Sequence, residues 1–152
     1  DNEGNTITQF QPKMNEVISE ESANKMLGLL KAVIDEGTGR RIRYKFNLKC
    51  EMGGKTGTTN RNSDAWFIGF TPTLVSGCWV GGEDRDIHFD NMQMGQGASM
   101  ALPIWAYYMQ KVFADPRLGY SPDAIFDLPD NFNPCASDAT EAEYNGIDEI
   151  YE

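Results

Sequence analysis

The sequence lacks any run of about 18 apolar residues, which excludes a membrane-spanning helix of ordinary length. Its three cysteines, Cys50, Cys78 and Cys135, form neither an even set nor the paired spacing of a zinc site, so no disulfide framework or structural metal is indicated. Basic residues are scarce, with 13 Lys and Arg against 23 Asp and Glu. The net charge of −10 argues against nucleic acid as a partner.

The few basic residues are concentrated in one stretch. Residues 37–61 carry seven basic side chains and one acidic, a local charge of +6, whereas residues 112–152 carry ten acidic and one basic, a local charge of −9. The seven are Arg40, Arg41, Arg43, Lys45, Lys49, Lys55 and Arg61. This stretch would favour an anionic ligand, although a solvated basic loop is the simpler interpretation for the individual arginines.

Periodicity predicts two helices and a small sheet. Ser19 is a suitable N-cap for a helix from Glu20 to Glu36, which has one apolar face. The other predicted elements are a short strand at 6–10, a basic connector at 40–49, strands at 53–59, 64–70 and 74–80, a polar loop at 81–97, a helix at 98–113 whose regular part begins near Leu102, and extended coil after Asp115. The strands at 64–70 and 74–80 are apolar at both alternating positions, which is typical of strands covered on both faces, and one helix pair would cover a small sheet only partly.

The segment Gly54-Lys55-Thr56-Gly57-Thr58-Thr59 carries the clearest chemistry. On a strand edge, lysine supplies positive charge, threonine hydroxyls donate hydrogen bonds, and a glycine lets another backbone come close, which suits a peptide ending in a carboxylate. A phosphate-binding loop would need glycine where Lys49 stands and a helix directly afterwards, so that alternative is disfavoured. A strand of small polar residues without function remains a further alternative.

Several separated motifs resemble the C-terminal part of the transpeptidase domain of bifunctional (class A) penicillin-binding proteins. They are Gly37-Thr38-Gly39, the Lys55 segment, Asp64-Ala65-Trp66-Phe67, Gly69-Phe70-Thr71-Pro72, Trp79-Val80-Gly81 and Ala101-Leu102-Pro103-Ile104-Trp105, in that order. The resemblance covers residues 1–114, and residues 115–152 form an acidic, Pro-, Asp- and Asn-rich C-terminal extension. It implies an α/β fold of the α+β type, with an antiparallel sheet flanked by helices in a partial, β-lactamase-like arrangement.

The resemblance also implies roles for the segment. Lys55 would be the electrostatic anchor and assist proton transfer, while Thr56 and Thr58 would hold the carboxylate of a peptidoglycan stem peptide or β-lactam. The backbone N–H of Thr58 would help stabilise the oxyanion. Gly57 would let the substrate lie along the strand, and Thr59 completes the predicted substrate-binding residues. No metal or cofactor is implied. The parent protein would lie at the bacterial cytoplasmic membrane, with this part soluble and on its outer side.

The nucleophile expected for this family is not found. Ser22-Ala23-Asn24-Lys25 matches Ser-x-x-Lys, but it falls in the first turn of an amphipathic helix and is too near Lys55 to leave room for the helical half of the domain. The start at Asp1 suggests a piece of a longer protein or a mature form. Because the nucleophile is missing, the chain alone is expected to be inactive and to need the rest of its parent. Two alternatives remain open: part of a related β-lactamase or D,D-carboxypeptidase, and a non-catalytic peptide-binding or assembly module.

Two weaker expectations concern residues 74–90. The strand at 74–80 would lose a neighbour and expose an apolar edge, and we expect self-association through that edge or the adjoining face. Asp84, Asp86, His88 and Asp90 alternate as metal ligands on a strand would, but a lone histidine among loop carboxylates favours a solvated loop without metal.

Overall fold

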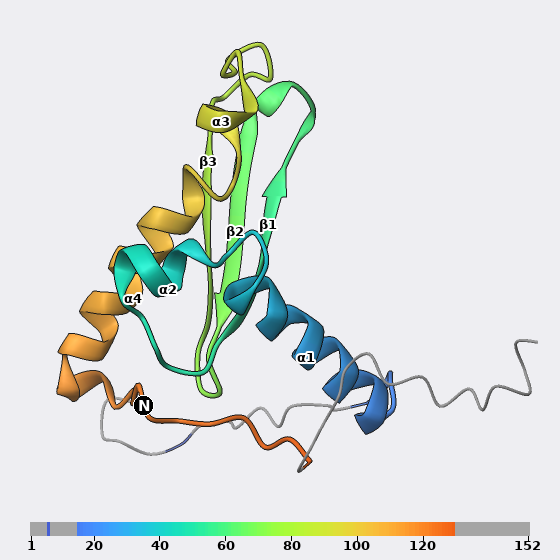
Figure 1. Ribbon diagram of the computed structural model, residues 1–152, viewed down its shortest axis with the longest axis vertical. Coiled ribbons are helices and arrows are strands. Elements are labelled where there is room, and N and C mark those ends of the chain that lie inside the picture. The colour runs from blue at the N-terminus through green and yellow to red at the C-terminus, as the bar shows by residue number, and fades with distance from the viewer. Residues whose placement is uncertain (1–5, 7–14, 130–152) are drawn as a thin grey trace, which may run out of the picture.

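The structure is a computed structural model that describes Thr6 and residues 15–129. The strand expected at 6–10, apart from Thr6, and the acidic tail after Ala136 lie outside the described residues. The elements follow the order α1 (Glu20–Asp35), α2 (Arg41–Phe46), β1 (Gly53–Thr58), a 3-10 turn (Asn60–Asn62), β2 (Asp64–Phe70), β3 (Val75–Gly81), α3 (Met92–Gly95), α4 (Ala101–Ala114) and a 3-10 turn (Pro116–Leu118) (Figure 1).

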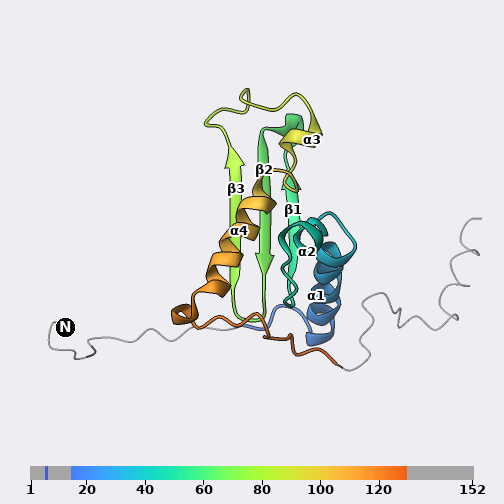
Figure 2. The ribbon, with the colours of Figure 1, turned by 60° about the vertical axis from the view of Figure 1, so that its left-hand side comes forward.

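The three strands form an antiparallel sheet in the order β1-β2-β3. Lys55 lies opposite Ile68, and Trp66 lies opposite Trp79. Side chains alternate along a strand, so the cross-strand pair Thr56 and Phe67 lies on one face of the sheet, and the adjacent pair Lys55 and Ile68 lies on the other. We call these the inner and outer faces. Figure 2 shows α4 crossing in front of β2 and β3, with α1 and α2 beside β1.

The core lies between the inner face and α4. Phe67 is fully buried and meets Trp105 edge to face, with ring centroids 5.1 Å apart. The Trp105 indole also donates from Nε1 to Ser76 Oγ of β3, at 2.8 Å. The buried residues of α4 follow helical spacing, so one stripe of the helix faces the sheet; they are Ala101, Leu102, Trp105, Ala106, Met109 and Val112.

The outer face differs from the prediction. Trp66, Ile68 and Trp79 are 44%, 49% and 47% exposed, so apolar residues at both alternating positions of β2 and β3 are not covered on both sides. None of the helices described in residues 15–129 lies over these three side chains. The typical cover on both faces is therefore not found, and the helices cover the sheet only in part, as expected for one helix pair. Apolar character indicates a preference for burial, but a buried face also needs a covering element.

The predicted first helix is confirmed as α1, with Ser19 Oγ accepting the Ser22 N–H at its N-cap.

The basic connector expected at 40–49 is only partly a connector, because it contains α2. Ile42 and Phe46, four residues apart, are both buried in the core, and that pair folds the stretch into a short helix. The loop at 81–97 likewise ends in the single turn of α3, which Asn91 caps through its side chain.

A segment after α4 returns to the lower end of the sheet. Phe126 packs on Phe70 with ring centroids 5.8 Å apart, and its N–H donates to Glu51 Oε2 at 2.6 Å. Lys31 of α1 bonds the other oxygen of Glu51 at 2.8 Å and lies 5.4 Å from the Phe126 ring centroid. Burial opposes ionisation of Glu51, but the Lys31 and Phe126 donors outweigh it and lower its pKa. The carboxylate thus joins α1 to the segment that carries Phe126.

Candidate functional site at the free edge of the first strand

β1 is an edge strand, and half of its backbone polar groups face away from the sheet. Thr59 donates its N–H to Asp64 O at 3.0 Å, and this bond shows which residues of β1 direct their backbone groups towards β2. Because antiparallel bonds alternate, Lys55 and Gly57 bond to β2, whereas Thr56 and Thr58 point their N–H and C=O groups to the free edge. The edge therefore offers a backbone donor at each threonine to an incoming chain.

The side chains of the segment divide between the two faces. Lys55 is exposed on the outer face, opposite Ile68, while Thr56 and Thr58 belong to the inner face. The Lys55 ammonium donates to Thr56 O at 2.8 Å, and this carbonyl points to the free edge. The cation is therefore at the edge itself, where it makes no ion pair with any carboxylate among the described residues.

Each threonine hydroxyl already has one partner. Thr58 Oγ1 accepts the Gly97 N–H at 3.1 Å, which leaves the hydroxyl proton available for an acceptor at the edge. Thr56 Oγ1 lies 3.0 Å from Thr38 Oγ1, just beyond the end of α1. The sequence does not indicate Gly97 or Thr38 as partners of these hydroxyls, because they lie 39 and 18 residues from Thr58 and Thr56.

Gly57 and Thr59 occupy different surroundings. A Cβ on Gly57 would lie 3.2 Å from Trp66 Cβ, so the glycine leaves room on the outer face. Thr59 belongs to the turn after β1: its hydroxyl donates to Asp64 Oδ2 at 3.0 Å and accepts the Asp64 N–H at 2.9 Å. The Thr59 side chain therefore fixes the turn in which β1 ends.

Asp64 is the acceptor at the centre of that turn. Trp79 Nε1 donates to Oδ1 at 3.0 Å, and Ser63 Oγ donates to Oδ2 at 3.2 Å beside Thr59. The Trp79 bond, then the Thr59 and Ser63 bonds, lower the pKa of the Asp64 carboxyl, with a further contribution from the positive charge of Arg85. The ionised carboxylate thus ties the end of β1 to β3.

This lowered pKa predicts how stability depends on pH. An unfolded aspartate has a pKa of about 3.9, so the folded-state pKa lies below that value. The stabilising contribution is complete above the unfolded pKa and is lost as the pH falls through the folded pKa. We expect Asp64→Asn to be less stable than the wild type near pH 7, with a difference that narrows as the pH falls from 5 towards 2.5. Urea unfolding at a series of pH values measures this.

Asp90→Asn is the matched control, since Asp90 is exposed and accepts no hydrogen bond within the described residues. Its difference from the wild type should stay small throughout. A loss of stability in Asp64→Asn that does not vary with pH would contradict the conclusion that folding lowers the pKa of the Asp64 carboxyl.

The other residues considered from sequence lie apart from this edge. Ser22 is exposed in the first turn of α1, about 20 Å along the helix from the end that approaches β1, and Lys25 forms an i,i+4 ion pair with Glu21 at 2.7 Å. Asp84, Asp86, His88 and Asp90 lie in an exposed loop. The described part of the chain contains no group of three potential metal-ligating side chains.

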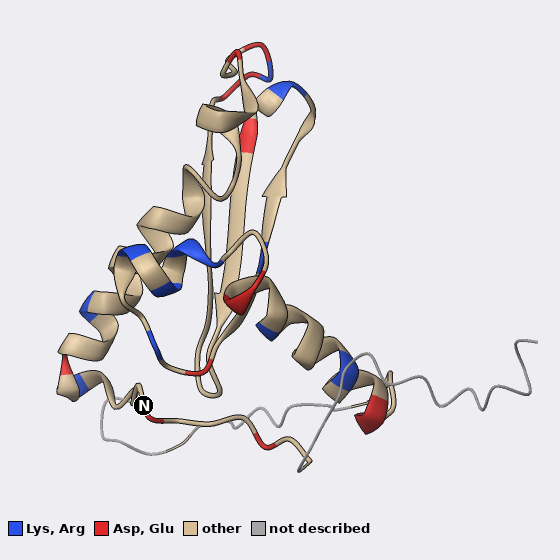
Figure 3. Cartoon of the chain, viewed as in Figure 1, with Lys and Arg blue, Asp and Glu red and all other residues tan. Residues whose placement is uncertain are grey.

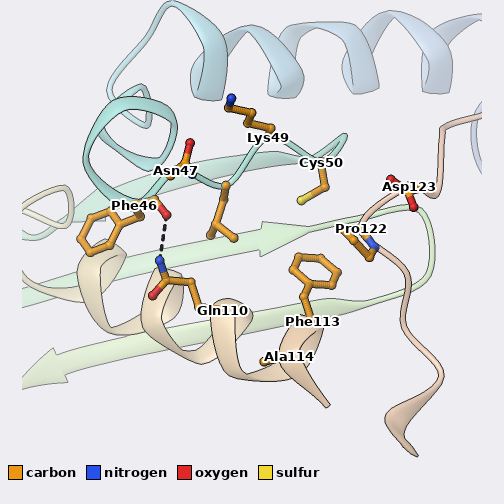
Figure 4. A pocket seen from close by; sticks show the side chains of 10 residues that line it. Phe46, Asn47, Lys49, Cys50, Gln110, Phe113, Ala114, Pro122 and Asp123 are labelled. Carbon is orange, nitrogen blue, oxygen red and sulfur yellow. Dashed lines mark hydrogen bonds between the residues drawn. The ribbon is translucent and has the colours of Figure 1, made fainter. Parts of the chain in front are cut away.

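A cavity of about 550 Å³ lies between the α2–β1 connection, the end of α4 and the segment near Pro122 (Figure 4). Phe46, Cys50 and Phe113 give it apolar walls, and Gln110 Nε2 donates to Phe46 O at 2.7 Å on one side. It contains none of the residues of β1. We therefore assign the candidate site to the edge of β1 and not to this cavity.

Charge is distributed unevenly around the fold. Figure 3 shows basic residues on α2, on the connection that follows it, on β1 and on the β1–β2 turn, while acidic residues gather in the loop after β3. Arg43 of α2 is engaged by Asp35 and by the carbonyls of Leu48 and Cys50. Part of the predicted basic stretch is thus structural, and Lys55 is the member positioned on the free edge.

Comparison with known proteins identifies relatives of the chain. Penicillin-binding protein 1A of Aquifex aeolicus is 35% identical over 139 residues, which cover 88% of this chain and 18% of that protein. Penicillin-binding protein 1B of Vibrio cholerae is 33% identical over 110 residues, covering 72% of this chain and 13% of that protein. The chain is homologous to part of the class A penicillin-binding proteins. It spans less than a fifth of the length of these relatives.

A solved structure shows the same relationship as the sequences. The crystal structure of penicillin-binding protein 1A from Haemophilus influenzae superposes with a TM-score of 0.60 and 32% sequence identity, over 75% of this chain and 17% of that one. The three-stranded antiparallel sheet with its helices therefore matches part of a penicillin-binding protein. A scan against protein-family models finds no match. None of the helices in the described residues is long and apolar enough to cross a membrane.

Proposed function

We propose that this chain is the C-terminal part of a penicillin-binding transpeptidase domain, and that the free edge of β1 binds the terminal carboxylate of a peptidoglycan stem peptide or of a β-lactam. The observation that carries the proposal is the edge itself. Lys55 brings a cation to it, Thr56 and Thr58 bring hydroxyls, and both threonines turn backbone donors outward. Homology to proteins named for binding penicillin supports the same assignment.

Each residue of the edge has a separate role in binding, which follows from its position. The Lys55 ammonium attracts the carboxylate, and the Thr56 and Thr58 hydroxyls donate to its oxygens. The Thr58 N–H then lies one residue along the bound peptide, where it stabilises the oxyanion that forms when the preceding carbonyl is attacked. One such donor is worth about 3 kcal/mol in acyl-transfer enzymes. Gly97 acts as a positioning residue, because its N–H orients the Thr58 hydroxyl.

The acylated serine belongs, in this proposal, to a part of the parent protein outside this sequence. The chain alone binds the carboxylate and forms no acyl-enzyme. The parent lies at the cytoplasmic membrane with this part on its outer side, and it cross-links peptidoglycan. The outward edge of β3 pairs with the rest of the parent or, in the isolated chain, with a second copy.

Titration of the isotope-labelled chain with acetyl-D-alanyl-D-alanine, followed by amide NMR, tests carboxylate binding. We expect the free-acid peptide to shift the amides of Thr56 and Thr58, and the peptide amide to have little effect. Lys55→Gln should weaken binding of the acid about fivefold, which corresponds to the upper end of an exposed ion pair.

Lys49→Gln is the matched control, because Lys49 is an exposed lysine of the same basic stretch and lies off the strand. It should bind the acid as the wild type does. Equal binding of the acid and the amide, or equal losses in the two lysine variants, would overturn the proposal.

A further inference from the structure

The loop after β3 covers a further cavity, which contains no residue of β1. This cavity, of about 350 Å³, lies between the start of β2, the end of β3, the loop and the residue before α4. Five apolar side chains line it: Ala65, Val80, Ile87, Phe89 and Met100. Its volume lies within the range of ligand-binding pockets, about 300–1,000 Å³.

The inner wall of this cavity belongs to the core, whereas its mouth is exposed. Ala65 is buried in the core, and Val80 and Met100 pack against it. By contrast, Ile87 is 61% exposed, and Phe89 is exposed too, although both line the cavity. An apolar group that entered the cavity would remove the two side chains at the mouth from water, and this burial favours binding.

Contacts with neighbouring segments hold the mouth in place. Asn62 Nδ2 donates to Phe89 O at 3.2 Å, and the Phe89 N–H returns to Asn62 O at 3.4 Å. A Cβ on Gly82 would lie 2.8 Å from Ile87 Cβ, and a Cβ on Gly95 would lie 3.0 Å from Phe89 Cβ. Because both side chains pack directly against a glycine, they are positioned before a ligand arrives, and less ordering entropy opposes binding.

Carboxylates surround the mouth. Residues 82–91 carry four acidic side chains and one basic, a local charge of −3, and Figure 3 shows the acidic ones gathered in this loop. The four are all exposed, and none forms an ion pair with a Lys or Arg among residues 15–129; they are Glu83, Asp84, Asp86 and Asp90. The mouth therefore presents uncompensated negative charge, which attracts a basic partner and repels an anionic membrane surface.

The exposed apolar surface continues into α3. Met92 and Met94, on the single turn of this helix, are both exposed. Methionine side chains are flexible and adapt to the shape of a partner, and they are common at surfaces that bind polypeptide segments. The apolar surface beside the mouth is thus suited to a polypeptide and is larger than one small molecule would need.

We propose that the mouth of this cavity is a docking site for a polypeptide segment that carries a bulky apolar side chain between basic residues. The apolar side chain enters the cavity against Ala65 and Met100, and the flanking Lys or Arg side chains pair with the carboxylates of the loop. This inference does not rest on the proposed function, because the cavity shares no residue with the edge of β1 and selects a partner of the opposite charge.

Three synthetic peptides test the two parts of this recognition by NMR titration of the full chain. Acetyl-Lys-Lys-Phe-Lys-Lys-amide should bind about tenfold more tightly than the same peptide with serine in place of phenylalanine, because one aromatic ring leaves water. It should shift the amides of Gly82 and His88 and the methyl group of Met100. Acetyl-Glu-Glu-Phe-Glu-Glu-amide should show no measurable binding, because the carboxylates of the loop repel it.

Variants with matched controls locate the site. Ile87→Ser removes one side of the mouth and should reduce the preference for phenylalanine over serine to less than about threefold. Ile125→Ser should keep the full preference, because Ile125 is 75% exposed and does not line the cavity. Asp86→Asn should weaken the basic peptides about twofold, as for an exposed ion pair. Asp127→Asn, at an exposed carboxylate outside the loop, should not weaken them.

Several outcomes would overturn the proposal. Equal binding of the phenylalanine and serine peptides, or a preference that survives in Ile87→Ser, would show that charge alone accounts for binding. Shifts confined to the outer face around Trp66 and Trp79, or no binding of any peptide, would also overturn it. Sedimentation equilibrium tests a second copy as the occupant: a dimer that Ile87→Ser dissociates and Ile125→Ser does not would assign the mouth to self-association and overturn the basic partner.

Discussion

Trp105→Ala should lower the free energy of unfolding by about 3–5 kcal/mol, the range for removing a large aromatic side chain from a core. Trp105 is 1% exposed and meets Phe67 of the central strand. A Cβ on Gly69 would lie 2.4 Å from its ring, so the indole is packed directly on the backbone of β2. Removing it leaves a cavity between α4 and the sheet, and it also removes the donor to Ser76. Urea unfolding followed by circular dichroism measures the loss.

Two further variants make this prediction specific. Tyr108→Ala removes an aromatic side chain from the exposed side of the same helix and should change the stability by less than about 1 kcal/mol. Trp105→Phe keeps most of the ring packing and should fold with an intermediate loss, even if the alanine variant does not fold. A Trp105→Ala protein as stable as Tyr108→Ala would show that α4 does not depend on this contact.

Gly97→Ala should also have a large effect, on stability and on the site. A Cβ at this position would lie 2.3 Å from Trp66 O and 2.6 Å from Gly57 O, both backbone atoms of the sheet. Because neither can move alone, the segment before α4 has to shift, at a cost of about 1–3 kcal/mol. Arg41 holds the next residue through Ala98 O at 3.1 Å and resists that shift. The Gly97 bond to Thr58 should lengthen, which amide NMR detects as a shift at Thr58.

Gly77→Ala is the comparison for this substitution. Gly77 lies on the outer face of β3, where a Cβ would make only an ordinary contact of 3.4 Å with Ile68. We expect its stability to stay within about 0.5 kcal/mol of the wild type and its Thr58 amide to be unchanged. If Gly97→Ala behaves like Gly77→Ala, Gly97 does not position the Thr58 hydroxyl.

Sequence alone predicted the elements with clear local signals. Ser19 and the apolar stripe defined α1, and Pro103 correctly limited the start of α4 to the residues around Leu102. α2 was missed because its basic residues dominate the stretch, although Ile42 and Phe46 carried a helical signal four residues apart. The strand pattern does not show which face is left uncovered, because no local pattern states where a covering element lies; only the small number of helices indicated that the cover would be partial.

For the candidate site, the sequence supplies a prediction of the residues, and the structure supplies their geometry. Lys55, Thr56 and Thr58 follow from the motif, and the alternation of a strand already implies that the lysine and the threonines lie on opposite faces. The contacts of Thr58 with Gly97 and of Thr56 with Thr38 depend on tertiary packing.

The glycines of β1 affect how easily this edge strand opens locally. Gly53, Gly54 and Gly57 make up half of this six-residue strand, which is bonded to a neighbouring strand on one side only. Glycine loses the most conformational freedom on folding, so such a strand is among the first parts of a sheet to open locally while the core stays closed. A ligand that adds hydrogen bonds along the open side would therefore suppress these openings, and recognition at the site would be coupled to the order of the strand itself.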